Sequence, residues 1–183
     1  MIKNPYLYGE ISISRSARYF PANLIFKPFI ILSAIFLFFY WINNLKLFNE
    51  FLSRKIIGQF SKKFFYFGIL SCVFLGLHAI FLGLDFGSEI FMKIRKIIII
   101  LFIVFEVCAQ FFLTKNLLKF RDNLKNNINS TILSIKICFV SLVFFITIFS
   151  FAFLVWGDLD GSVKHILEWN YFTFLLIYYF LSR

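Results

Sequence analysis

Five long apolar stretches, separated by short loops that carry charged residues, fill nearly the whole chain. They run over residues 28–45, 64–84, 97–118, 131–156 and 165–181. A helix needs about 20 apolar residues to cross the hydrocarbon core of a bilayer, and each stretch is close to that length. The stretches lack the period-two alternation of barrel strands, and only helices or closed barrels satisfy the backbone in lipid. We therefore predict an all-α integral membrane bundle of five transmembrane helices.

The composition indicates a chain embedded in a lipid bilayer, and the lengths of the connectors indicate a single domain. Hydrophobic residues make up 61% of the 183 residues, and the mean hydropathy is +0.85. A soluble domain of this size would have too little polar surface to cover its core. The connectors leave no room for a soluble domain, and no signal-peptide pattern precedes the first stretch. Residues 1–183 are therefore expected to form one transmembrane domain.

The basic residues of the short loops predict the orientation of the chain. They flank the first and third connectors as Lys46, Arg54, Lys55, Lys62 and Lys63, and as Lys115, Lys119, Arg121 and Lys125. Because short basic loops stay in the cytoplasm, we expect the N-terminus outside and the C-terminus inside, in a plasma or inner membrane. Five basic residues fall on the predicted outer side against this trend: Arg15, Arg18, Lys93, Arg95 and Lys96.

Residues 46–60 have the pattern of an amphipathic helix lying on the inner leaflet. Apolar residues recur at spacings of three and four, as Leu47, Phe48, Phe51, Leu52, Ile56 and Phe60. Lys46, Arg54 and Lys55 fall mostly between them, and with Lys62 and Lys63 they would face anionic lipid headgroups. The alternative is an extension of the first or second span. The net charge of +10 is spread over helix ends, so nucleic acid is not an expected partner.

Polar residues inside the second and third stretches predict a polar seam. His78 and Glu106 are ionisable, and such groups within a membrane usually face the protein interior. In the third stretch, Gln110 follows Glu106 on the same helix face. In the second stretch, Ser71 precedes His78 by seven residues and shares a face with it. Adjacent antiparallel helices would let these side chains meet. The seam is either a site that carries protons or binds headgroups, or polar contacts that hold two helices together.

Small residues line another face of the second stretch. Gly68, Cys72 and Gly76 recur at spacings of four, which is typical of close helix packing. The three cysteines, Cys72, Cys108 and Cys138, share no metal-site spacing and are expected to be buried free thiols. No phosphate loop, serine elbow or zinc motif is present, and the sequence indicates no cofactor.

Acidic residues gather in the two loops predicted to lie outside. They are Asp85, Glu89, Asp158, Asp160 and Glu168, with His165 one helical turn before Glu168. Carboxylates and an imidazole that converge near the membrane surface could bind a divalent cation. The alternative is that these residues keep short loops hydrated.

Two short stretches resemble the outer-loop signature of the Frag/DRAM/Sfk family of multipass membrane proteins. Ile13-Ser14 precedes Pro21 and Phe26 as the family's Ile-Ser pair does, and Glu168-Trp169 is similar to the Glu-Trp that opens its last helix. The order of the apolar segments agrees over most of the chain. Arg15 and Ala17 depart from the acidic residue and glycine usual there, and the family's extra N-terminal helix is missing.

The resemblance implies a six-helix type of bundle reduced to five that acts on membrane lipids. With the basic segment and the polar seam, it predicts a protein that interacts with or regulates lipids. The alternative is a small accessory subunit of a larger membrane complex, because the chain is short and carries no catalytic motif. A proton-coupled transporter using His78 and Glu106 is a third possibility, against which the lack of repeats and broken helices argues.

Overall fold

The computed structural model describes residues 4–17, 20–82, 84, 89–124, 129–156 and 160–182. Within these ranges the secondary structure is helical and contains no strand, which confirms the all-α class. Two single turns precede five long helices: α1 (Pro5–Tyr8), α2 (Ile13–Ser16), α3 (Ala22–Ser53), α4 (Lys63–Phe81), α5 (Glu89–Lys119), α6 (Ser130–Trp156) and α7 (Gly161–Phe180).

Four of these helices, α3 to α6, are long and apolar enough to cross a membrane. They correspond to the first four predicted spans, although α3 begins six residues earlier and ends eight residues later than expected. The fifth predicted span is the helix α7, which is 20 residues long but falls outside this group. Polar residues in its first half, among them Lys164, His165 and Asn170, lower its hydropathy.

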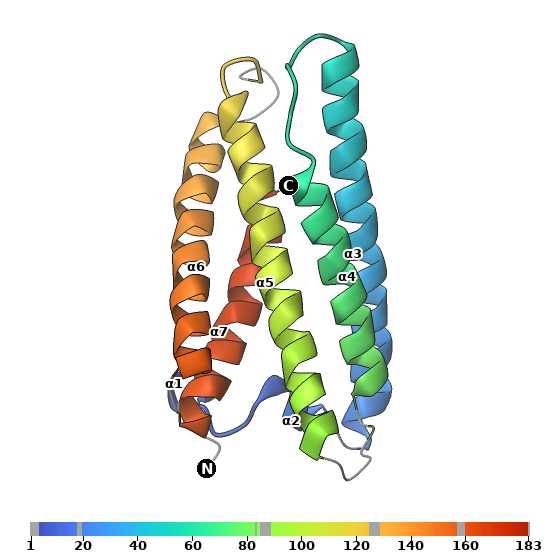
Figure 1. The fold of residues 1–183 in the computed structure, drawn as a ribbon, viewed down its shortest axis with the longest axis vertical. Helices are drawn as coiled ribbons and strands as arrows, with labels where there is room; N and C mark the ends of the chain where they lie inside the picture. Colours follow the sequence, from blue (N-terminus) through green and yellow to red (C-terminus); the bar gives the residue numbers. More distant parts are fainter. Residues whose placement is uncertain are drawn as a thin grey trace.

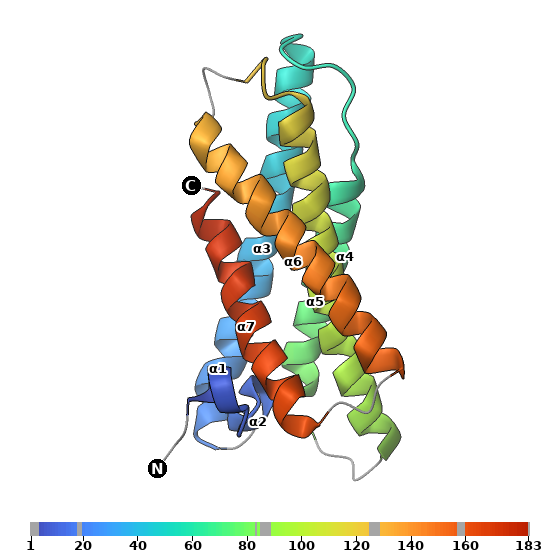
Figure 2. The same cartoon turned by 90° about the vertical axis from the view of Figure 1, so that its left-hand side faces the viewer.

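Helix α5 lies at the centre of the bundle. It packs against α4, α6 and α7, while α3 covers the outer side of α4 (Figure 1). Seen from the side, α6 and α7 form a layer in front of α5, and α1 and α2 lie against the first half of α7 (Figure 2). The N-terminal segment therefore closes one end of the bundle, and the loop between α3 and α4 lies at the other.

The structure contains no separate interfacial helix over residues 46–60. Residues 46–53 continue α3. Its end is capped by the backbone N–H of Arg54, which donates to the Glu50 carbonyl at 3.0 Å, and by that of Lys55, which donates to the Leu52 carbonyl at 3.0 Å. Lys55 has a φ of 57°, in the left-handed region that turns the chain away from the helix. The segment from there to Lys62 is irregular. Up to Ser53 this segment therefore extends the first span, which is the alternative given by the sequence.

Close packing between α3 and α4 occurs at one position of the small-residue stripe. A Cβ placed on Gly68 would lie 2.4 Å from the ring of Trp41, which is fully buried. Trp41 also packs against Phe64, with ring centroids 6.3 Å apart, and Phe64 packs against Phe48. A Cβ on Gly76 would meet nothing within 4 Å, so the stripe does not act as a unit. Gly68 is the position where only hydrogen fits.

Candidate functional site

A buried carboxylate joins three helices at the middle of the bundle. Glu106 of α5 is 1% exposed. The hydroxyl of Ser71 in α4 donates to its Oε2 atom at 2.6 Å, and the amide of Gln110 donates to Oε1 at 3.1 Å. The hydroxyl of Tyr179 in α7 also donates to Oε1. Side chains of three residues therefore hydrogen-bond a carboxyl group that would be costly to bury without partners.

Of the residues predicted to form the polar seam, Ser71, Glu106 and Gln110 are hydrogen-bonded to one another, and His78 is not joined to them. His78 is buried in α4. The charged residue that interacts with it electrostatically is Arg95 of α5. Among the described residues, no hydrogen bond or ion pair links His78 to Glu106. The two residues lie at different depths, since Ser71, the α4 partner of Glu106, precedes His78 by about 10 Å of helix.

A buried cation lies elsewhere in the bundle. Lys136 of α6 is 5% exposed, and its ammonium donates to the hydroxyl of Ser182 at 2.7 Å. The same ammonium lies 4.3 Å from the centre of the Tyr178 ring, in the arrangement of a cation–π contact. Across the part of the chain that the structure describes, neither Lys136 nor Glu106 has an ion-pair partner. The carboxyl of Glu106 has hydroxyl and amide partners, and the ammonium of Lys136 has a hydroxyl and an aromatic ring.

The described residues include only part of the predicted outer acidic cluster. Asp85 and Asp158 lie outside the described residues, and Glu89 and Asp160 are exposed at the starts of α5 and α7. Asp160 accepts a hydrogen bond of 2.8 Å from Ser162, which lowers the pKa of its carboxyl below the ordinary value. No group of three metal-ligating side chains occurs within the described ranges. Asp160 is therefore hydrogen-bonded within the first turn of α7 and is not part of a described metal centre.

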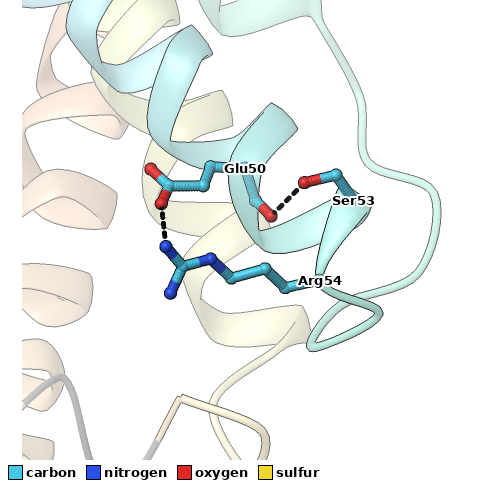
Figure 3. A network of polar contacts seen from close by, with 3 residues as sticks. All are labelled: Glu50, Ser53 and Arg54. Atoms are coloured by element: carbon cyan, nitrogen blue, oxygen red, sulfur yellow. Dashed lines mark hydrogen bonds and ion pairs between the residues drawn. The ribbon is translucent and has the colours of Figure 1, made fainter.

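The basic residues Lys46, Arg54, Lys55, Lys62 and Lys63 are exposed at the end of the bundle that holds the α3–α4 loop. Arg54 forms an ion pair of 2.5 Å with Glu50, and Ser53 donates to the Glu50 carbonyl at 2.8 Å (Figure 3). The ammonium of Lys63 lies 5.5 Å from the centre of the Phe112 ring. These side chains form an exposed basic rim around the loop, as expected of residues at a membrane surface.

A pocket of about 540 Å³ opens between α5, α6 and α7 near the end of the bundle that holds α2. Its walls are mostly apolar and include Ile99, Ile100, Ile103, Val104 and Leu167. Its deep end holds Thr147 and Tyr171, which are both buried, and Tyr171 donates to Ser150 at 3.2 Å. An apolar cavity of this volume with few polar groups has the character of a small-molecule site.

The shallow end of this pocket is charged. Lys96 of α5 and Lys164 of α7 are both exposed, and His165, Glu168 and Ser12 complete the mouth. His165 and Glu168 were predicted as members of an acidic cluster, and the structure places both at this mouth instead. The pocket has polar groups at its mouth and apolar walls below them. A membrane leaflet has the same order, with polar headgroups above apolar acyl chains.

The segment over residues 4–17, which we call the N-terminal strap, fixes the position of the mouth. The His165 Nδ1 atom lies 2.8 Å from the carbonyl of Gly9, and Trp169 donates its indole N–H to the carbonyl of Ile11 at 2.9 Å. The Tyr6 ring packs on Trp169 with centroids 5.4 Å apart. Gly9 has a φ of 60° and lies so close to Ser162 that a Cβ would approach its carbonyl oxygen to 2.0 Å. The strap is therefore docked on α7 through its main chain.

Several residues of these sites carry no recognisable signal in the sequence. Tyr179 and Tyr171 belong to an aromatic-rich apolar stretch, and Lys96 is one of several basic residues near the start of α5. Their roles depend on how α7 crosses α5, which no spacing within one helix specifies. An ionisable residue in an apolar stretch is a usable signal, and it identified Glu106.

The fold is that of an α-helical protein with four helices long and apolar enough to cross a membrane. It contains a buried carboxyl cluster and an apolar pocket with a charged mouth. No family model, curated protein or solved structure matches this chain.

Proposed function

We propose that this chain is a multipass membrane protein that binds lipid and acts on the composition or organisation of its membrane. The observation that carries this proposal is the pocket between α5, α6 and α7. Along α5 it extends from Lys96 to Val104, which is about 12 Å of helix, and along α7 from Gly161 to Tyr171, about 15 Å. Half of a hydrocarbon core about 30 Å thick has the same depth. The pocket therefore suits an acyl chain that enters from one leaflet.

Two further observations support a lipid ligand. Two of the segments that resemble the Frag/DRAM/Sfk family, those around Ile13 and Glu168, lie close together. Trp169 donates to the carbonyl of Ile11 next to α2, and Glu168 and Ser12 both line the pocket. The basic rim at the other end of the bundle suits anionic headgroups of the inner leaflet. With that rim in the cytoplasm, the pocket opens toward the outer leaflet and the N-terminus lies outside.

A pocket-filling variant tests this function. The full chain, extracted in a mild detergent, is examined by native mass spectrometry, which counts retained lipids. Val104→Trp places an indole inside the pocket and is expected to remove the retained lipid. The matched control is Ile97→Trp, which adds the same ring at a position that is 54% exposed on the same helix. Equal lipid retention by the wild-type chain and Val104→Trp would exclude the pocket as a lipid site.

An accessory subunit of a larger membrane complex is the second candidate. The apolar surface of α3 favours it, because only Ala34, Trp41 and Phe48 are buried along this 32-residue helix. Lipid or a partner helix would cover the remaining side chains. In the same native spectra, a second polypeptide in fixed stoichiometry supports this alternative, and a chain that carries lipid alone contradicts it.

A further inference from the structure

The mouth of the pocket carries cations on two facing helices. Lys96 projects from α5 and Lys164 from α7, and both are exposed where the pocket opens. Glu168 is the one acidic residue among the lining side chains, and it lies one turn after Lys164 on the same helix. With His165 neutral, the formal charge of the lining side chains is +1. An anion would therefore be attracted to the mouth and a cation would not.

The depth of these lysines corresponds to the headgroup region. Helix α5 is 31 residues long, or about 46 Å, and exceeds a hydrocarbon core of about 30 Å by roughly 8 Å at each end. Lys96 lies seven residues after Glu89, about 10 Å along the helix. This places its Cα close to the boundary of the hydrocarbon, from which a lysine side chain extends toward the phosphates.

We propose that the pocket is selective for an anionic phospholipid, with one acyl chain along the apolar walls and the phosphate between Lys96 and Lys164. This inference rests on the proposed lipid-binding function and adds the class of headgroup. A zwitterionic headgroup would bring its own ammonium group toward the two lysines, which reduces the attraction. An anionic phosphodiester with an uncharged substituent brings no opposing positive charge, so its attraction to the two lysines is not reduced.

The surrounding contacts hold the α7 side of this site in place. The Gly9 carbonyl can only accept a hydrogen bond, so the Nδ1 atom of His165 donates to it and the ring position is fixed. Lys164 precedes this anchored residue, and its backbone N–H donates to the Asp160 carbonyl at 3.3 Å. These contacts fix the main chain from which the Lys164 side chain extends, so phosphate binding does not have to order this turn of α7.

A headgroup competition tests the selectivity. The full-length chain is placed in mixed micelles with equal amounts of phosphatidylglycerol and phosphatidylcholine of identical acyl chains, and native mass spectrometry gives the ratio of the two bound lipids. We expect phosphatidylglycerol to predominate in the wild-type chain. Lys96→Gln and Lys164→Gln are each expected to reduce this preference about fivefold. Lys96→Arg keeps the charge and should retain the preference.

The matched control is Lys93→Gln, which removes the same charge three residues earlier from the same helix, at an exposed position that does not line the pocket. It should leave the ratio unchanged, and a reduction equal to that of Lys96→Gln would overturn the proposal in favour of a diffuse surface charge. If Val104→Trp removes both lipids while the lysine variants leave the ratio unchanged, the pocket binds lipid without headgroup selection. If the wild-type chain retains neither lipid, the proposed function itself is wrong.

Discussion

The hydroxyl of Ser71 in α4 donates a hydrogen bond of 2.6 Å to the carboxylate of Glu106 in α5. Tyr179 of α7 binds the other oxygen of the same carboxylate. One side chain thus connects the α3–α4 hairpin to the last helix across the centre of the bundle.

The first prediction concerns this carboxylate. Glu106→Leu would remove the acceptor of the Gln110 amide and the Tyr179 hydroxyl, whereas the Ser71 hydroxyl keeps the Gly68 carbonyl as its acceptor. Leaving such donors unsatisfied costs more than the hydrogen bonds contribute. We expect the free energy of unfolding in detergent, measured by a denaturant titration, to fall by about 2 to 4 kcal/mol. Glu106→Gln keeps one acceptor oxygen and should cost about half as much. Unchanged stability of Glu106→Leu would show that the cluster does not hold the helices together.

The second prediction concerns the contact between α3 and α4. Gly68→Ala would place a methyl group 2.4 Å from the buried ring of Trp41, so one helix must shift. Overpacking of this kind typically costs about 1 to 3 kcal/mol, and a lower midpoint of thermal unfolding in detergent should report it. Gly76→Ala is the matched control, because its Cβ meets nothing within 4 Å and alanine favours the helix. Similar midpoints for the two variants would contradict the close approach.

The third prediction concerns the N-terminal strap. Gly9→Ala would combine an unfavourable left-handed φ with a clash against the Ser162 carbonyl, so we expect the strap to leave α7. Hydrogen exchange of residues 4–17 should then become faster in the variant. Gly161→Ala, whose Cβ meets nothing within 4 Å, is the control. Protection equal to that of the wild-type chain would show that Gly9 is not needed for docking.

The fourth prediction concerns orientation. Gln59 and Asp160 are exposed at opposite ends of the bundle. In a chain whose cysteines Cys72, Cys108 and Cys138 are replaced, a membrane-impermeant maleimide should label Asp160→Cys in intact cells. Gln59→Cys should react only after permeabilisation, because the proposed orientation places its loop, within the basic rim, in the cytoplasm. The reverse pattern of labelling would place the pocket in the inner leaflet.

Apolar length and intramembrane charge predicted the helical class and part of the carboxylate cluster. The stretches around Ser71 and Glu106 are long enough to be helices, and an acid within one of them has to face protein. The position of Tyr179 was not predictable, because the tilt of α7 decides which of its residues meets Glu106. His78 was expected to meet Glu106 because the second and third spans were taken as adjacent antiparallel helices. The structure instead pairs Glu106 with Ser71, two turns away from His78.

The interfacial helix and the pocket show two other limits of sequence patterns. Residues 46–53 have the same periodicity whether the helix lies on a membrane or continues α3, and the left-handed residue Lys55 is not a glycine that would mark the turn. The pocket draws on α5, α6 and α7, and no single helix carries its pattern. The end of α3 and the position of the pocket therefore depend on contacts between helices, which the periodicity of a single segment does not predict.

The N-terminal strap is bound through its main chain, since the carbonyls of Gly9 and Ile11 accept from His165 and Trp169, and that of Tyr6 accepts from Asn170. Most strap side chains are thus free to diverge among related proteins, while the donors on α7 are not. Distant relatives should be easier to find by the pattern His-x-x-x-Trp-Asn at the start of a final helix than by the residues before the first span.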